Sequence, residues 1–315
     1  MVLADITTQG PKTKSVSFGK LRWTSIERPS EAETEDLARC YSFHTLDLDD
    51  CLNRIQRPKV DAYDDYLFMV FHFPVFNKKA RVTTASQVSI FLGEHYLITL
   101  HDGNLKPLTE FFIGCETNEE TRQMMMGHSS GYLLYVILDR LVTYCFPILN
   151  KIGENIDATE EKVFADDARE VVRELSMLRR DVLSFRRITR PQTEVFQWLE
   201  KSELPFLKED PAVYFGDLAD HNRRIMDLLD EYKEVTEGLN DTNNTLASFR
   251  INQVMRLLTI MSAIILPLTL IASVFGMHLD HLPLSGDTIA FPALMAAMFI
   301  IIIGMLAFFR IKRWL

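Results

Sequence analysis

Two long apolar runs stand near the end of the chain. One run extends from Leu257 to Phe275 and the other from Ile289 to Phe309, and neither contains a charged residue. Each run has about twenty residues, the length that an α-helix needs to cross the hydrocarbon layer of a membrane. The pattern therefore predicts two transmembrane helices, at about 255–275 and about 289–309.

Basic residues flank this pair of runs, whereas the short connection between them is acidic. The connection contains Asp280 and Asp287 but no Lys or Arg. The basic residues of the outer flanks are Arg250, Arg256, Arg310, Lys312 and Arg313. Because basic flanks remain on the cytoplasmic side, both termini are predicted to be cytoplasmic and the connection to lie outside.

The polar side chains of the first run share one side of a helix. Asn252, Thr259, Leu266 and Ser273 repeat at intervals of seven, as do Met255, Ser262 and Thr269. Such hydroxyls commonly bond to their own helix or join neighbouring helices. A continuous stripe that begins with Asn252 instead favours a polar pathway. Since one hairpin cannot enclose a pore, this interpretation requires several copies of the chain.

The rest of the chain mixes strand and helix patterns and is then helical. Alternating or β-branched segments predict strands at 15–26, 66–76 and 86–103, the last with a hairpin turn at Gly93-Glu94. Helices are expected after Ser30 and from Asp47, as their N-caps, then at 131–163 and 166–190, and from residue 213 toward Phe275. We therefore expect an α+β domain over 1–118, a region of long helices over 119–250 and a membrane hairpin over 251–315.

Composition and motifs exclude several classes of function. The net charge of −9 argues against a nucleic-acid partner and suits a protein that handles cations. The four cysteines form no metal-binding or disulfide pattern, and the first twenty residues lack the apolar run of a secretion signal. The sequence has no phosphate-binding glycine loop, HExxH motif or nucleophile elbow, so an enzyme is not expected.

Several segments together resemble the CorA-type divalent metal ion transporters. They are LDLDDCLNRIQRPKVDAYDDYLFMV (46–70), YLLYVILD, YFGDLADH, NQVMRLLTIMSAIILPLTLIASVFGM (252–277) and the basic tail RIKRWL. The resemblance covers nearly the whole chain. It implies a homopentameric funnel in a bacterial-type inner membrane, with Mg²⁺ as the usual substrate and Co²⁺ and Ni²⁺ also carried.

The resemblance also implies roles for individual residues. The pore line of the family falls on Asn252, Met255, Leu258, Ser262, Leu266 and Thr269. Inhibitory Mg²⁺ would bind between neighbouring subunits at Asp50 and Asp217, with Asp49 and Asp139 as a second cluster. Carboxylate oxygens suit a largely hydrated Mg²⁺.

One departure from the family pattern concerns the outer mouth of the pore. The family signature is Gly-Met-Asn, whereas this chain has Gly276, Met277 and His278. Neutral histidine offers one acceptor nitrogen in place of an amide oxygen, and imidazole binds Zn²⁺ directly. Three alternatives stay open: a Mg²⁺ transporter in which His278 fills the volume of Asn, a transporter of zinc or another transition metal, and a membrane-anchored sensor or scaffold that does not conduct.

Overall fold

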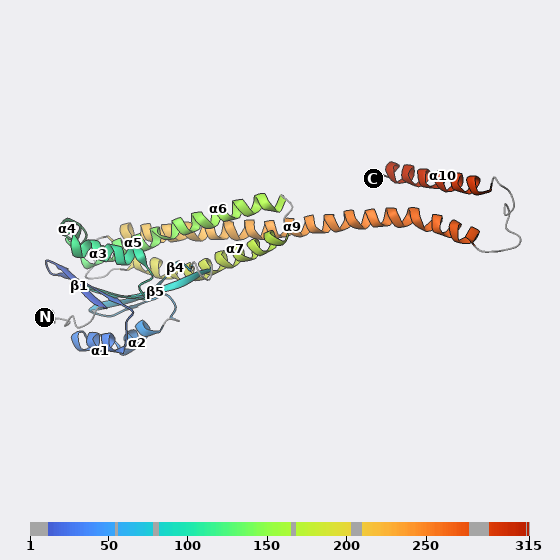
Figure 1. Ribbon diagram of the computed structural model, residues 1–315. Helices are drawn as coiled ribbons and strands as arrows, with labels where there is room; N and C mark the ends of the chain where they lie inside the picture. Colours follow the sequence, from blue (N-terminus) through green and yellow to red (C-terminus); the bar gives the residue numbers. More distant parts are fainter. Residues whose placement is uncertain are drawn as a thin grey trace. The chain divides into compact units, whose positions relative to one another are not determined.

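The computed structural model describes residues 12–53, 56–77, 82–164, 168–202, 210–276, 290–312 and 314. The chain divides into two compact units, residues 1–240 and 241–315. The first unit contains a sheet and the helices that cover it, and the second contains two apolar helical segments (Figure 1).

A six-stranded mixed sheet forms the centre of the first unit. Its strands are β1 (Thr13–Phe18), β2 (Leu21–Glu27), β3 (Lys59–Ala62), β4 (Tyr66–Asn77), β5 (Val82–Gly93) and β6 (Tyr96–His101). They lie in the order β1-β2-β6-β5-β4-β3, and only the β2–β6 pair is parallel. The predicted buried strand is β4, and the predicted hairpin is β5–β6 with its turn after Gly93. The segment predicted as strand at 15–26 is a second hairpin, which turns at Gly19 with a φ of +58°.

Two short helices cover one face of this sheet. They are α1 (Glu31–Cys40) and α2 (Thr45–Leu52) (Figure 1). Ser30 caps α1 as predicted, and Glu33 completes a capping box. The N-cap predicted for α2 is wrong, because α2 begins at Thr45 with His44 as its cap. Asp47 instead lies inside the helix, is buried and accepts a hydrogen bond of 3.0 Å from the Tyr66 hydroxyl.

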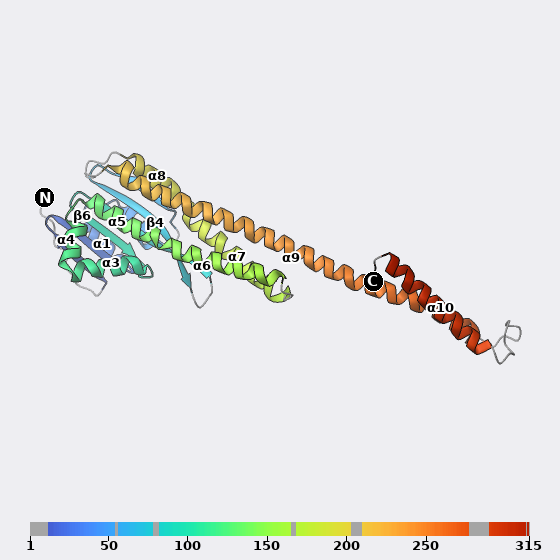
Figure 2. The ribbon, with the colours of Figure 1, turned by 90° about the horizontal axis from the view of Figure 1, so that it is seen from above.

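The remaining helices of the first unit cover the opposite face (Figure 2). They are α3 (Lys106–Thr117), α4 (Glu119–Met126), α5 (Ser130–Thr143), α6 (Cys145–Phe164), α7 (Ala168–Thr189), α8 (Gln192–Lys201) and the first part of α9 (Pro211–Gly276). The helix predicted over 131–163 is divided between α5 and α6. Pro147 has no N–H with which to bond the carbonyl of Thr143, so the helical hydrogen bonding is interrupted there.

Ion pairs join the long helices. Lys162 of α6 lies 2.6 Å from Glu174 of α7, and Arg186 of α7 lies 2.7 Å from Asp230 of α9. These groups are partly exposed, so each pair contributes only about 0–1 kcal/mol. The buried apolar faces of the helices contribute more to their packing against the sheet.

The second unit contains the end of α9 and α10 (Ala290–Ile311). Three helical stretches of the described chain are long and apolar enough to cross a membrane: Ser130–Phe164, Pro211–Gly276 and Pro292–Ile311. Half of the apolar window in the first stretch is buried, against 6% in each of the other two. Burial within the first unit accounts for the apolar face of the first stretch, whereas the apolar windows of the other two are almost uncovered in the described chain.

Candidate functional site

The six residues of the predicted pore line lie on an exposed side of α9. Their side chains, from Asn252 to Thr269, are all classed as exposed in the single chain, and Leu266 retains 67% of its accessible surface. At 100° per residue, these positions cluster on one side of the helix. The predicted pore line is therefore a largely exposed surface of α9, with Trp314 beside Asn252 and Met255 in a pocket at its start.

The opposite side of the same helix is the covered one. Ile260 is buried, and the half-buried residues of the segment are Ala263, Ile264, Pro267, Leu268 and Ile271. Both views draw α10 beside this part of α9 (Figures 1 and 2). The hairpin thus has an inner side toward α10 and, roughly opposite it, the side that carries the polar residues.

The threonine hydroxyl groups on this side donate their hydrogens within the helix itself. Thr269 donates its hydroxyl hydrogen to the carbonyl of Leu266 at 2.9 Å, and Thr259 donates to the carbonyl of Met255 at 2.7 Å. The hydroxyl lone pairs remain available to accept hydrogen bonds. Such oxygens can receive the hydrogens of water molecules that surround a cation.

The predicted outer mouth is described only in part. Gly276 is the last residue of α9. Met277 and His278 lie outside the described residues, and the role of all three residues stays a prediction.

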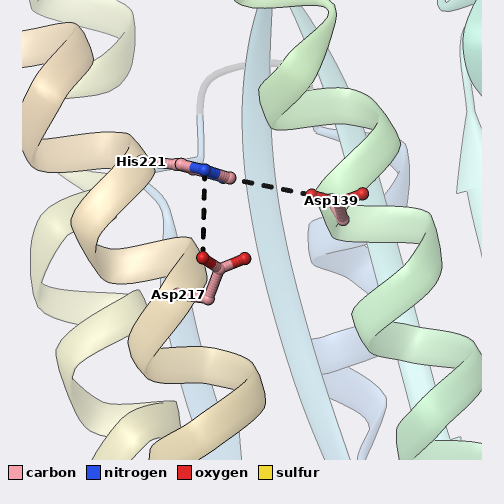
Figure 3. Close-up of side chains that lie close together, drawn as sticks. All are labelled: Asp139, Asp217 and His221. Atoms are coloured by element: carbon pink, nitrogen blue, oxygen red, sulfur yellow. Dashed lines mark ion pairs between the residues drawn. The ribbon is translucent and has the colours of Figure 1, made fainter.

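A second candidate site lies in the first unit, where α5 faces α9. His221 Nδ1 is 4.0 Å from an oxygen of Asp139, and its Nε2 is 3.9 Å from an oxygen of Asp217 (Figure 3). The candidate ligand atoms of these three residues all lie within 4.8 Å of one another. Two carboxylates and one imidazole at this spacing could hold a divalent cation.

The electrostatics of this cluster favour a bound cation. Burial raises the pKa of the Asp139 carboxyl, His221 opposes that rise, and the negative charge of Asp217 adds to it. The two carboxylates therefore disfavour each other's charge, and a cation between them would relieve that repulsion. Sequence reasoning selected both aspartates but missed His221. Its position four residues after Asp217, on the same face of a helix, was the available signal.

The other two predicted regulatory residues lie apart from this cluster. Asp49 is exposed on α2. Asp50 lies next to it, and one of its oxygens is 2.7 Å from the ammonium of Lys59. Within the described residues, neither aspartate belongs to a group of three metal-ligating side chains. Their predicted pairing with Asp217 and Asp139 concerns neighbouring copies of the chain and stays a prediction.

Comparison with known proteins identifies the family. A family model described as CorA-like Mg²⁺ transporter protein matches residues 18–313. The chain belongs to this family. The cobalt/magnesium transport protein CorA of Thermotoga maritima is 30% identical over 275 residues, which cover 87% of this chain and 78% of that protein.

Solved structures of the CorA-like family share the fold. The complete structure of the CorA magnesium transporter from Methanocaldococcus jannaschii matches with a TM-score of 0.85 and 25% identity, over 97% of this chain and 95% of that one. This match confirms the predicted α+β domain followed by a long helix and a C-terminal apolar helix. The zinc transport protein ZntB of Yersinia enterocolitica is also similar, with 20% identity over 264 residues, 82% of this chain and 77% of that protein.

Proposed function

We propose that this chain carries divalent cations across a membrane through a pathway lined by α9. The observation that carries the proposal is the exposed stripe from Asn252 to Thr269, opposite the side of the helix that faces α10. The stripe lies in the second of the three apolar helical stretches, Pro211–Gly276. Membership of the CorA-like family supports Mg²⁺ as the substrate, and the similarity to a cobalt/magnesium transport protein supports Co²⁺ as a second one. The resemblance of the sequence implies that Ni²⁺ is also carried.

A single α9 cannot enclose a pathway, so the active form is a homo-oligomer within the lipid bilayer. The sequence resemblance implies five copies around one axis. Both termini are then cytoplasmic and the connection between α9 and α10 faces outward, because the basic residues flank the hairpin. The active form is thus a homopentamer of an inner-membrane protein, with the first unit in the cytoplasm.

The apolar members of the stripe suit a gate. Leu258 and Leu266 are 52% and 67% exposed in the single chain, and their copies around an axis would narrow the pathway with apolar surface. A narrow apolar ring loses its water and stops ions without a physical plug. The polar residues of the stripe would accept hydrogen bonds from the water shell of the cation: Asn252 before the two rings, Ser262 between them and Thr269 after them.

The Asp139–Asp217–His221 cluster is the proposed regulatory site. These residues fit a divalent cation because three ligand atoms converge and two of them are carboxylate oxygens. A bound cation supplies the positive charge that this cluster lacks. Without it, Asp139 and Asp217 repel each other and any carboxylate of a neighbouring copy, such as Asp49, and that repulsion loosens the contact between copies. Internal Mg²⁺ would thereby restrain its own uptake.

A zinc transporter is the second candidate function. His278 replaces the amide of the family signature, and imidazole favours Zn²⁺ over Mg²⁺. The likeness to a zinc transport protein supports keeping this candidate. A non-conducting scaffold is disfavoured, since a membrane anchor needs no register of hydroxyl and amide groups on one side of a helix.

Ion uptake by purified protein in liposomes tests the proposal. Vesicles that contain an indicator dye are exposed separately to Mg²⁺, Co²⁺ and Zn²⁺, and protein-free vesicles are the control. We expect uptake of Mg²⁺ and Co²⁺ that requires the protein. Uptake of Zn²⁺ with exclusion of Mg²⁺ would favour the zinc transporter. Absence of uptake of all three ions would favour the non-conducting scaffold.

A further inference from the structure

The Lys59 ammonium lies between two carboxylates at the edge of the sheet. Its Nζ is 2.7 Å from an oxygen of Asp50 on α2 and 2.5 Å from an oxygen of Asp61 on β3. The second oxygen of Asp50 accepts a hydrogen bond of 2.6 Å from the Gln56 amide. Both oxygens of Asp50 therefore already have partners within the chain.

The ammonium of Lys59 and the carboxylates around it are charged and partly shielded from water. The Asp50 side chain is only 15% exposed and that of Lys59 33%, and the ammonium lies 5.2 Å from the centre of the Phe68 ring. Burial alone would lower the pKa of Lys59, but its hydrogen bonds to Asp50 and Asp61 raise that pKa above its usual value. The ammonium is thus a permanent positive charge at this place.

The fit of a metal ion at Asp50 can be judged from these contacts. A directly bound Mg²⁺ needs a free carboxylate oxygen at about 2.1 Å. A fully hydrated ion needs an approach that the adjacent ammonium does not oppose. Asp50 offers neither, whereas Asp49 is exposed and the ion pairs described for Asp139 and Asp217 are with His221. The residues at Asp50 therefore do not fit a bound Mg²⁺.

We infer that Lys59 is a built-in cation that takes the place of a metal ion at Asp50, and that Asp50 and Asp61 form a latent divalent-cation site which opens when the ammonium is removed. The geometry carries this inference, because both carboxylates direct an oxygen to one point. The inference rests on the proposed function only in its consequence for regulation. The metal dependence of gating would then reside in the Asp139–Asp217–His221 cluster and not at Asp50.

Counting bound ions tests the inference without measuring transport. Full-length protein in detergent is freed of metal and titrated with Mn²⁺, and the free ion is measured by electron paramagnetic resonance. We expect Lys59→Met to bind one more Mn²⁺ per chain than the native protein. Adding Asp50→Asn to that variant should remove the gain, and Asp50→Asn alone should leave the native number unchanged.

Two further variants serve as controls. Lys151→Met removes a lysine that pairs with one exposed carboxylate, Glu154 at 2.8 Å, and should add no ion. Lys59→Arg keeps a positive charge and should bind the native number.

A folded Lys59→Met protein that gains no ion would overturn the inference, as would a loss of bound Mn²⁺ in Asp50→Asn alone. The second measurement does not depend on whether Lys59→Met folds. Failure of the proposed function would appear separately, as absence of uptake by the native protein in liposomes.

Discussion

The hydroxyl of Thr269 donates a hydrogen bond of 2.9 Å to the carbonyl of Leu266, one turn earlier on α9. Pro267 lies between these two residues and cannot donate to the carbonyl of Ala263. The helix is nevertheless continuous through this segment. The single hydroxyl hydrogen of Thr269 is thus used within its own helix. The lone pairs of the hydroxyl oxygen can still accept hydrogen bonds from water molecules in the proposed pathway.

The sidedness of α9 predicts a difference between two adjacent residues. Ser262 is exposed and belongs to the stripe, whereas Ala263 is half-buried on the side toward α10. In a background whose four native cysteines are replaced, Ser262→Cys should lose Mg²⁺ uptake after treatment with a charged, water-soluble thiol reagent. Ala263→Cys should retain it. Equal sensitivity of the two variants would contradict a water-filled pathway along this stripe.

The acceptor role of Thr269 predicts the effect of removing its oxygen. Thr269→Val keeps the shape of the side chain but offers nothing to the water shell of the ion. The loss of a hydrogen bond of about 1 kcal/mol corresponds to a fall in Mg²⁺ uptake of about fivefold. Thr269→Ser, which restores the oxygen, should recover most of the rate in the same liposome assay. Unchanged uptake in Thr269→Val would show that the Thr269 hydroxyl does not contact the hydrated ion.

The pore stripe was predictable because helical period and residue type both depend on nearby sequence. The spacing of Asn252, Ser262 and Thr269 fixes their common side whatever the rest of the chain does. The parallel pairing of β2 with β6 was not predictable in this way, since its partners lie more than seventy residues apart. Trp23, for example, donates a hydrogen bond to Thr99 across this pair.

The proposed regulatory residues likewise include some that the sequence indicated and others that only the packing of distant segments brings together. Two aspartates were selected from the family resemblance, but His221 joins Asp139 only because α5 and α9 pack together. Likewise, a sequence cannot show that Lys59 reaches across to Asp50 from another element. Asp47 was misassigned as a helix cap because capping preference is local, whereas burial beside Tyr66 depends on the packing of α2 on the sheet.

His278 predicts a change in ion selectivity on return to the family signature. His278→Asn replaces the imidazole with an amide oxygen that accepts hydrogen bonds from hydrated Mg²⁺. We expect the ratio of Mg²⁺ uptake to Zn²⁺ uptake to rise, as measured with both ions on the same preparation of vesicles. His281→Asn, three residues later, is the matched control and should leave the ratio unchanged. If His278→Asn does not change the ratio of Mg²⁺ uptake to Zn²⁺ uptake, His278 only fills the volume of the family's Asn and does not determine selectivity.

The Asp139–Asp217–His221 cluster predicts a loss of feedback. In Asp217→Asn, uptake should resist internal Mg²⁺, because one charged ligand is gone and the cluster therefore binds the inhibitory cation more weakly. The concentration of internal Mg²⁺ that halves the uptake should rise about tenfold or more, as expected for the loss of a charged ligand of about 1.5–3 kcal/mol. Asp220→Asn, on the same helix but paired with Arg223, is the control. The same response to internal Mg²⁺ in native and Asp217→Asn protein would locate regulation elsewhere.

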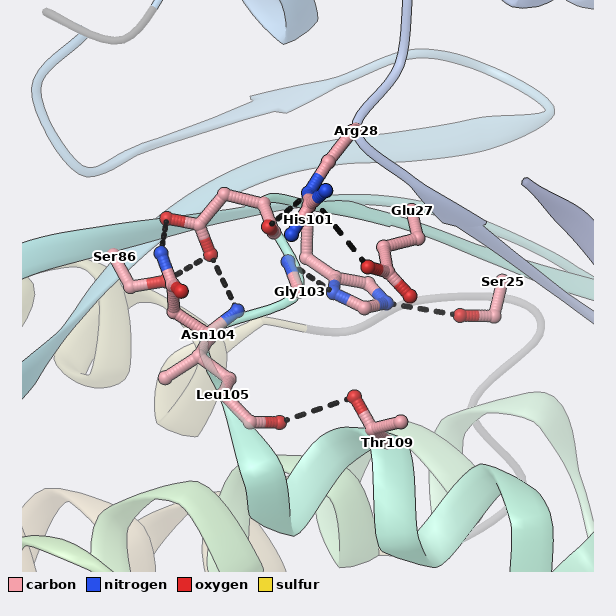
Figure 4. Close-up of polar contacts among 10 residues, drawn as sticks. Ser25, Glu27, Arg28, Ser86, His101, Gly103, Asn104, Leu105 and Thr109 are labelled. Atoms are coloured by element: carbon pink, nitrogen blue, oxygen red, sulfur yellow. Dashed lines mark hydrogen bonds and ion pairs between the residues drawn. The ribbon is translucent and has the colours of Figure 1, made fainter. Parts of the chain in front are cut away.

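A buried histidine predicts how the stability of the first unit depends on pH. His101 ends β6, where its Nε2 lies 3.0 Å from the Ser25 hydroxyl and its Nδ1 accepts a hydrogen bond of 3.1 Å from the Gly103 N–H (Figure 4). The acceptor role of Nδ1 fixes the neutral ring with its hydrogen on Nε2. Burial lowers the pKa of His101, and the nearby carboxylates of Glu27 and Asp102 only partly oppose that effect.

The sign of the effect follows from proton linkage. In the unfolded chain the histidine has its ordinary pKa near 6.5, so between that value and the lower pKa of the folded state the unfolded chain binds more protons. The free energy of unfolding should therefore be highest above about pH 6.5 and fall as the pH is lowered. One histidine contributes at most about 1.4 kcal/mol for each pH unit. Unfolding of metal-free protein, followed by the fluorescence of the buried Trp23, should show this loss between pH 7 and pH 5.

Substitution separates this contribution from other acid effects. His101→Gln removes the titration while its amide can still donate toward Ser25, so the dependence on pH should become shallower than in the native protein. His95→Gln, at the partly exposed turn between β5 and β6, should leave the dependence unchanged. If His101→Gln loses as much stability as the native protein over the same pH range, the protonation of His101 does not cause the loss. The acid sensitivity would then have to come from another buried imidazole of the unit, such as His72, whose pKa is also lowered by burial.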